Sequence, residues 1–214
     1  MIRAGKLRLR TIAPLVNCVR LESVARQIGY YAMRKRGGVI YNNHSIKNTP
    51  LNMAQVLINN IIRQLNEIQE GSLWFDQSIK DKIDNLSETE ALTRPIPSIH
   101  SVAEHVSHML EWRKECMLRL NGQQTDLMNS PDDWKDNTVL RAFGWNKLKE
   151  ALYNSRTELI DQVASQEDDY LENKFLNNEY NFHYLIEGII QHDLYHLGQI
   201  GITIKLLNQK KTTR

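Results

Sequence analysis

Two histidines near the C-terminal end of the sequence, His192 and His196, are spaced so that they can act on one ligand. They lie four positions apart in the segment HDLYH. Four residues correspond to about 40° around an α-helix, so both imidazoles project from one side and a single metal ion can reach both. Core histidines that only hydrogen-bond to carbonyls or carboxylates also show this spacing, so the pair alone leaves both interpretations open.

A third ligand would have to come from another segment, and two histidines, His105 and His108, compete for the role. His105 lies near the apolar stripe that begins at Val102, whereas His108 lies about 100° from the centre of that stripe. Periodicity alone therefore selects His105. Both fall in the first turns of a predicted helix, where the positive end of the helix dipole favours the neutral ring that a metal requires.

Apolar periodicity predicts the helices that position these residues. The first runs from Met53 to about Gly71, and a similar pattern continues over residues 74–86. Ser101 and Glu104 form a capping box at the start of the second helix, which is expected to end near residues 121–122. The capping box places His105 and His108 on this second helix.

Two further helices complete the predicted fold. The third carries Leu148, Leu152, Leu159 and Val163, and the fourth runs from near Asn181 to the basic tail at residues 210–211. Neither an internal repeat nor strand-like alternation is present, and the connections are long enough for at least one crossover. The sequence therefore predicts an all-α four-helix bundle over residues 51–210.

The first fifty residues differ in kind from the rest. Residues 1–50 contain ten Lys and Arg against a single acid, Glu22. We expect this basic N-terminal extension to be a poorly ordered leader, or the result of a start assigned upstream of Met53, rather than an arm that binds nucleic acid.

Composition limits the class of protein. The chain has 214 residues, of which 41% are hydrophobic and 24% charged, as expected of one globular domain with an appendage. It has neither an apolar run of about 18 residues nor a secretory signal, and its two cysteines, Cys18 and Cys116, cannot form a disulfide framework. We expect a cytoplasmic protein without a membrane partner.

Two segments together resemble a known family. Residues 101–112, SVAEHVSHMLEW, followed by residues 192–200, HDLYHLGQI, resemble the DinB-like (DinB/YfiT) metalloenzyme superfamily. The resemblance covers about Met53 to Leu207, with further matches at residues 74–76 and at Arg94-Pro95. Residues 1–50 match nothing in the family pattern.

The resemblance implies a four-helix bundle in which one histidine of the second helix and the HxxxH pair of the last helix bind a divalent metal, usually zinc or nickel. This pattern maps onto His108, His192 and His196, and so replaces the choice of His105 that periodicity made. His105 occupies a position that is normally apolar in the family, which keeps it as the alternative third ligand.

The resemblance also implies a reaction. Members include thiol-dependent S-transferases and a thiol-dependent isomerase, so we expect a small-molecule thiol and an electrophile as partners. Three imidazoles leave a divalent ion at least one open position, as in catalytic sites.

No protein nucleophile is assigned. The alternatives are a metal-dependent hydrolase and a non-catalytic stress-response bundle that binds metal or a small ligand. A homodimer is a further expectation.

Overall fold

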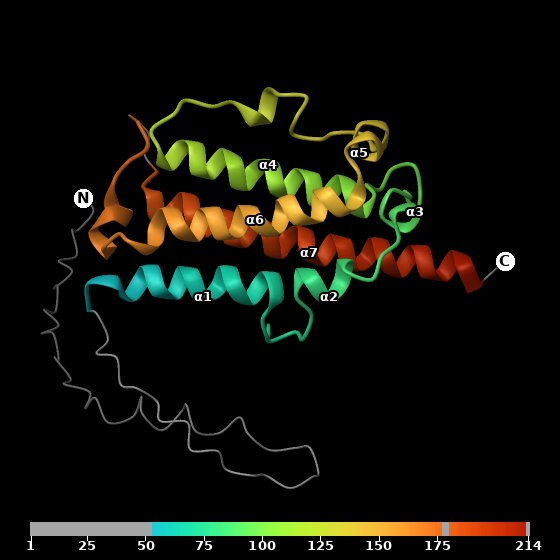
Figure 1. Ribbon diagram of the computed structural model, residues 1–214, viewed down its shortest axis with the longest axis horizontal. Coiled ribbons are helices and arrows are strands. Elements are labelled where there is room, and N and C mark those ends of the chain that lie inside the picture. The colour runs from blue at the N-terminus through green and yellow to red at the C-terminus, as the bar shows by residue number, and fades with distance from the viewer. Residues whose placement is uncertain (1–52, 177–179, 213–214) are drawn as a thin grey trace, which may run out of the picture. The chain divides into compact units, whose positions relative to one another are not determined.

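The computed structural model describes residues 53–176 and 180–212, coloured in Figure 1. The predicted basic extension and its boundary with the bundle lie outside these residues and stay predictions. Within the described part of the chain the fold is all-α, with a single isolated bridge between Lys174 and Asn181 as its only β pairing. None of the described helices combines the length and apolar character needed to cross a membrane.

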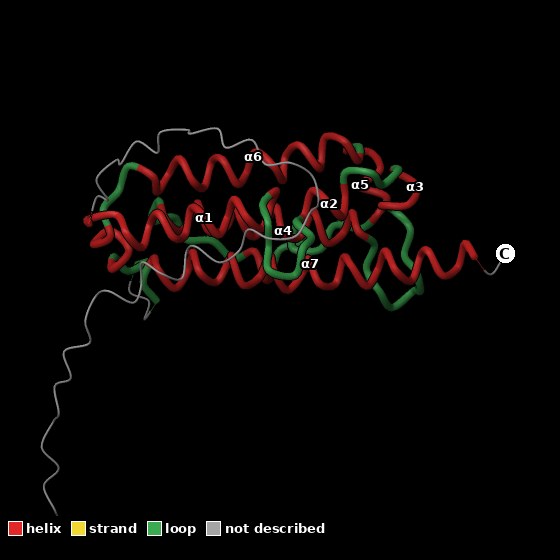
Figure 2. Tube along the Cα trace, turned by 90° about the horizontal axis from the view of Figure 1, so that it is seen from below, coloured by secondary structure: helices red, strands yellow, loops and turns green. Residues whose placement is uncertain are grey.

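Four long helices lie side by side, as predicted. They are α1 (Val56–Glu70), α4 (Val102–Leu120), α6 (Trp145–Ala164) and α7 (Phe182–Thr212), shown in Figure 1 and, turned, in Figure 2. Each contributes an apolar stripe to one core because residues three and four apart share a helix face. The core includes Ile61 and Leu65 of α1, Val106 and Met109 of α4, Leu152 and Leu159 of α6, and Ile186 and Ile200 of α7.

Shorter elements join the long helices. They are α2 (Ile79–Ile83), α3 (Glu88–Ala91), α5 (Asn137–Phe143) and the 3-10 helices η2 (Met53–Gln55), η3 (Leu127–Asn129) and η4 (Asp168–Glu172). Sequence periodicity did not predict α3 or α5, because a helix of one or two turns carries too few apolar positions to show a period.

The predicted capping box of α4 is present. The Glu104 backbone N–H donates to Ser101 Oγ, and the Ser101 backbone N–H donates to Glu104 Oε2 at 2.7 Å. Arg94 Nε also donates to this carboxylate, at 2.9 Å, which ties the preceding turn to the helix start. Burial by itself would raise the pKa of Glu104, but the hydrogen bonds from Arg94 and Ser101 hold it below its usual range.

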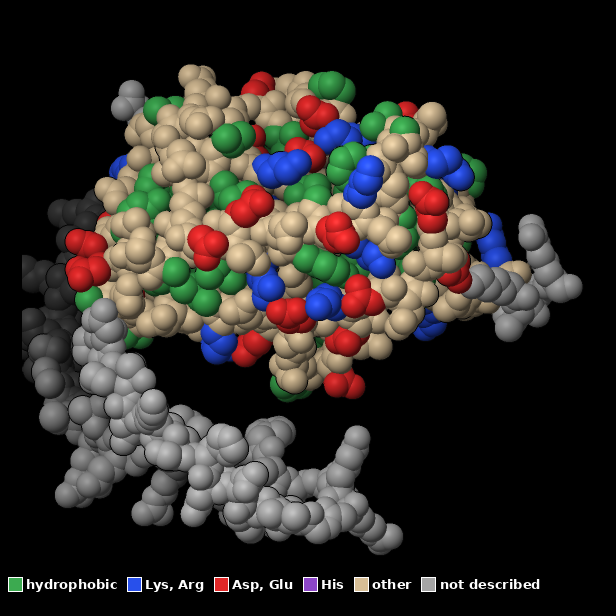
Figure 3. Space-filling model, in the orientation of Figure 1, with side chains coloured by type: hydrophobic (Ala, Val, Ile, Leu, Met, Phe, Trp, Pro, Cys, Tyr) green, Lys and Arg blue, Asp and Glu red, His purple; other side chains and the backbone are tan. Residues whose placement is uncertain are grey.

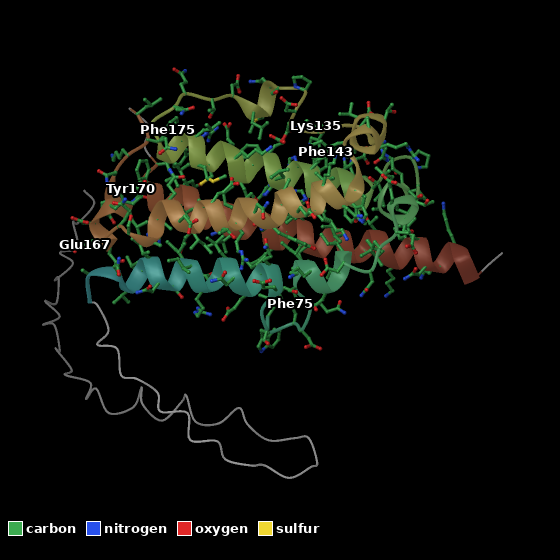
Figure 4. All side chains as sticks on the ribbon, in the orientation of Figure 1. Phe75, Lys135, Phe143, Glu167, Tyr170 and Phe175 are labelled. Atoms are coloured by element: carbon green, nitrogen blue, oxygen red, sulfur yellow. The ribbon has the colours of Figure 1, made fainter. Side chains whose placement is uncertain are left out.

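The prediction for residues 74–86 is partly wrong. Trp74 and Phe75 do not continue a helix but lie in the loop between α1 and α2, with 97% and 51% of their surface exposed. Figure 4 shows Phe75 at the edge of the bundle, in this loop. Asp76 has a φ of 78°, a left-handed conformation that is incompatible with a continuous helix. The helical pattern holds only from α2 onward, where Ile79 and Ile83 are fully buried.

The long connection after α4 is a crossover. Residues 121–136 run back along α4, so that α4 and α6 point in the same direction (Figure 1). Lys135 of this connection pairs with Glu111 of α4, with 3.0 Å between Nζ and Oε1, and is labelled above α4 in Figure 4. The crossover thereby brings Asp133 and Trp134 against the first half of α4, where His105 and His108 lie.

Candidate metal centre

Three histidines from two helices converge at one point. His108 of α4 and His192 and His196 of α7 each offer a ring nitrogen, and these nitrogens lie within 4.8 Å of one another. His108 Nε2 is 3.0 Å from His192 Nε2. His108 and His196 are buried, and His192 is partly exposed. The face drawn in Figure 3 shows no histidine of the described residues. A group with this geometry could hold a metal ion.

The crossover connection fixes the orientation of His108. His108 Nδ1 lies 2.8 Å from the backbone carbonyl oxygen of Asp133 and 3.0 Å from its Oδ1. The same carboxylate accepts a hydrogen bond from Trp112 Nε1 at 2.8 Å. Since both oxygens of Asp133 are acceptors, His108 Nδ1 carries the proton and Nε2 keeps the lone pair that a metal needs.

Trp134 forms the centre of a three-ring stack over the site. The centre of its ring lies 3.9 Å from the centre of the His108 ring and 4.0 Å from the centre of the His100 ring. The interplanar angles are 13° and 14°. This stack covers one face of His108 and restricts its rotation. Sequence reasoning missed Asp133 and Trp134, because they lie in an irregular connection that has no periodic signal.

His105 contacts His196, but no nitrogen of His105 is among the three that converge. Its side chain is buried, and its Nδ1 is 3.3 Å from His196 Nδ1. When His196 Nδ1 carries the ring proton and donates to His105 Nδ1, the lone pair of His196 Nε2 remains for a ligand. Periodicity placed His105 on the buried face, where the structure has it, but His108 is buried as well, and only the His108 nitrogen converges with those of α7.

Burial keeps these imidazoles neutral. It lowers the pKa of His196 to about 3, and the neighbouring His192, His108 and His105 add to the effect. For the same reason the pKa of His105 falls to about 4 and that of His108 lies below its usual range. At neutral pH the His108 and His196 lone pairs are therefore available to a metal.

The ring nitrogens of His108 and His192 are arranged as ligands of a divalent ion would be. His192 Nδ1 is buried and has no hydrogen-bond partner among the described residues, and the nearest carboxylate oxygen, Asp193 Oδ1, is 3.9 Å away. A proton placed between the two facing Nε2 atoms would leave this nitrogen as an orphaned acceptor. A cation between His108 and His192 would accept both Nε2 lone pairs, and Nδ1 would then carry the proton and be an unpaired donor, so the fit rests on the two facing Nε2 atoms. Imidazole donors suit zinc, nickel and related ions.

Asp193, between the two histidines of HDLYH, belongs to the core. Its Oδ2 accepts a hydrogen bond from Arg113 Nε at 2.9 Å, and both side chains are fully buried. The carboxylate is thus committed to a buried ion pair and is not free to act as a general base at the site.

A cavity of about 450 Å³ opens directly beside the three histidines. Its remaining wall consists of Trp112, Glu115, Cys116, Arg119, Trp134, Tyr184, Leu185, Gly188, Ile189 and Tyr195. Burial raises the pKa of the Cys116 thiol to about 12, so this cysteine stays protonated and acts as a small apolar side chain. The site combines a candidate metal centre with a mostly apolar space of a size typical for small ligands.

Comparisons with known proteins agree with this geometry. The family model described as DinB superfamily matches residues 79–200, which is more than half of the chain and includes all three converging histidines. No curated protein and no solved structure matches the chain.

Proposed function

The chain belongs to the DinB superfamily, and from that premise we propose that it binds one divalent metal ion through His108, His192 and His196. We propose further that it activates a low-molecular-weight thiol for attack on an electrophile. The observation that carries the proposal is the convergence of three imidazole nitrogens in the wall of a ligand-sized cavity. Zinc and nickel are the ions we expect from the family.

A divalent ion held by His108, His192 and His196 would supply a Lewis acid, which would lower the pKa of a low-molecular-weight thiol toward neutrality. In the transfer, one S–C bond forms, and the bond from that carbon to its leaving group breaks. The leaving group departs with the bonding pair, and the thiol proton passes to water. Only three protein ligands are required, which leaves room for the thiol.

The residues of the chain have separate tasks in this proposal. Asp133 orients His108 through its Nδ1 proton, and Trp134 restricts that ring by stacking on it. His105 contacts Nδ1 of His196 and thereby directs Nε2 of His196 to the ligand. Cys116 takes no part as a nucleophile, since its thiol stays protonated.

Two alternatives use the same three histidines. In a hydrolase, water would take the place of the thiol, because a divalent ion also lowers the pKa of water. In a non-catalytic bundle, the site would hold metal or a small ligand without turnover. The three functions differ in what the loaded protein does to an electrophile in the presence and absence of thiol.

The first test is the metal content of protein purified without an affinity tag, by elemental analysis, for the parent and for H108A, H192A and H105A. We expect about one equivalent in the parent and in H105A, and less than about a tenth in H108A and H192A. Loss of metal in H105A with retention in H108A would assign the third ligand to His105. Absence of metal from the parent after reloading would overturn the proposal.

The second test is turnover. The metal-loaded parent is incubated with 1-chloro-2,4-dinitrobenzene and several low-molecular-weight thiols, and conjugate formation is followed by absorbance. We expect conjugation above the rate in buffer, lost in H192A. Consumption of an ester substrate without thiol would favour the hydrolase, and a rate equal to that in buffer with every substrate would favour the non-catalytic bundle.

We place this activity in the cytoplasm, where low-molecular-weight thiols are kept reduced. Cys116 is a free, buried thiol, consistent with such a compartment. The proposed partners are therefore a small thiol and a small electrophile.

A further inference from the structure

The cavity beside the histidines has two distinct ends. Tyr184 and Tyr195 line it with 60% and 63% of their surface exposed, so they form its mouth. Cys116 and Ile189 line it with 3% and 5% exposed, so they form its floor. The indole rings of Trp112 and Trp134 belong to the same wall. A ligand that entered past the tyrosines would meet aromatic and aliphatic surface.

The wall carries one acid and one guanidinium, and these two groups pair with each other. Arg119 donates to Glu115 Oε1 from Nε at 3.0 Å and from NH2 at 2.6 Å. Thr125 Oγ1 donates to the same oxygen at 2.6 Å, and the Arg119 guanidinium lies 5.7 Å from the centre of the Phe175 ring. The opposite charges cancel, so this part of the wall offers no net charge to a ligand.

We infer that the cavity binds an uncharged aromatic or aliphatic group of the electrophile, while the polar thiol approaches from the mouth between Tyr184 and Tyr195. This inference rests on the proposed function for the identity of the two reactants. It names the class of substrate, which the proposed function leaves open.

The physical reason is the cost of desolvation. An apolar ring gains free energy when it leaves water for aromatic and aliphatic walls, and flat rings stack on indole. A charged group that entered the same space would lose its hydration and find a wall whose own charges are already paired. The cavity therefore selects against charge at its floor.

Gly188 provides a way to fill the cavity without touching a candidate ligand. It lines the cavity one helical turn before His192, and a Cβ built there meets no atom within 4 Å. Gly198 is the matched control: it lies on the same helix, a Cβ there also meets nothing within 4 Å, and it is absent from the cavity wall. Both positions gain the same helix propensity on substitution, so G188L and G198L differ chiefly in cavity volume.

The experiment uses the metal-free full chain and two fluorescent probes. N-phenyl-1-naphthylamine is uncharged, and 8-anilino-1-naphthalenesulfonate carries the same rings with a sulfonate. We expect the uncharged probe to bind with a stoichiometry of about one and at least tenfold more tightly than the sulfonate. G188L should weaken its binding at least tenfold, and G198L should change it less than twofold.

Unchanged binding of the uncharged probe in G188L, or tighter binding of the sulfonate in the parent, would overturn the inference. Circular dichroism checks that G188L is folded. If it is not, L185W narrows the same cavity from the preceding turn of α7, with the same expected loss of probe binding and the same contradicting result.

Metal content keeps the two proposals separate. Because the probes are titrated without metal, the expected probe pattern in a chain that binds no metal would support the cavity inference and refute the proposed function. Full metal content in parent and G188L, together with equal probe binding in both, would refute the cavity inference alone.

Discussion

Arg113 of α4 and Asp193 of α7 form a fully buried ion pair, with 2.8 Å between NH2 and Oδ2 and no exposed surface on either side chain. Arg113 NH1 also donates to Gln69 Oε1 of α1 at 3.2 Å and to the Leu152 carbonyl of α6 at 2.9 Å. One guanidinium thus joins α4 to the other three long helices. Asp193 follows His192 directly and lies three residues before His196. This ion pair therefore anchors the candidate metal centre to the core.

The first prediction concerns this ion pair. D193N leaves the buried Arg113 charge without its partner, and we expect the free energy of unfolding to fall by about 3 to 5 kcal/mol. Urea denaturation of the metal-free protein measures it. The control is E67Q, which removes a pair between Arg63 and Glu67 whose side chains are 57% and 34% exposed and should change stability by less than about 1 kcal/mol. Equal stability of D193N and parent would refute the role given to the pair.

The second prediction concerns the orientation of His108. D133A removes the carboxylate that contacts His108 Nδ1 and accepts from Trp112, but the backbone carbonyl 2.8 Å from Nδ1 stays, so we expect metal affinity to fall about tenfold. Competition with a chromophoric chelator measures it. D133N keeps an acceptor oxygen for Trp112 and should lie closer to the parent. D132A is the neighbouring control, and a D133A affinity as high as that of D132A would contradict the prediction.

The third prediction links metal to stability. If the three histidines bind the ion only in the folded state, free metal at a hundred times its Kd should stabilise the protein by about 2.7 kcal/mol. The melting temperature of the parent should rise with zinc and fall back when a chelator is added. H192A should show neither change. A parent melting curve that zinc leaves in place would argue for histidines with a purely structural role.

The fourth prediction concerns acid stability of the metal-free protein. In the folded state burial lowers the pKa of His105 to about 4 and that of His196 to about 3, whereas an unfolded chain has histidine pKa values near 6.5. Between these values the unfolded state binds more protons, so stability is full above about pH 6.5 and falls as the pH drops toward 4. Each histidine contributes a slope of up to about 1.4 kcal/mol per pH unit.

Urea denaturation at a series of pH values with a chelator present measures this slope. H105N removes one of the buried histidines whose pKa is lowered, so its stability should fall less steeply between pH 6.5 and 4 than that of the parent. Identical slopes in H105N and parent, or a parent that gains stability on acidification, would contradict the assignment.

Much of the fold follows from local rules that a sequence displays directly. The four long helices show the apolar period of 3.6 residues, and Ser101 with Glu104 marks the start of α4 because a capping box involves residues only three apart. The HxxxH spacing likewise places His192 and His196 on one side of α7 without knowledge of any neighbour. Where the apolar pattern was accidental, at Trp74 and Phe75, the same rules extended the helix wrongly.

The sequence by itself thus determined the four long helices, the bundle and the pair on α7, because helix periodicity and capping depend on residues a few positions apart. Only the tertiary structure decided which nitrogens converge, since that depends on how α4 packs against α7 and where the crossover returns. His105 and His108 both lie on α4. Nε2 of His108 faces Nε2 of His192, whereas His105 contacts only Nδ1 of His196 in this group. The contacts that bring Asp133 and Trp134 to His108, and Arg113 to Asp193, join residues 21 or more positions apart along the chain. No local pattern in the sequence encodes such contacts.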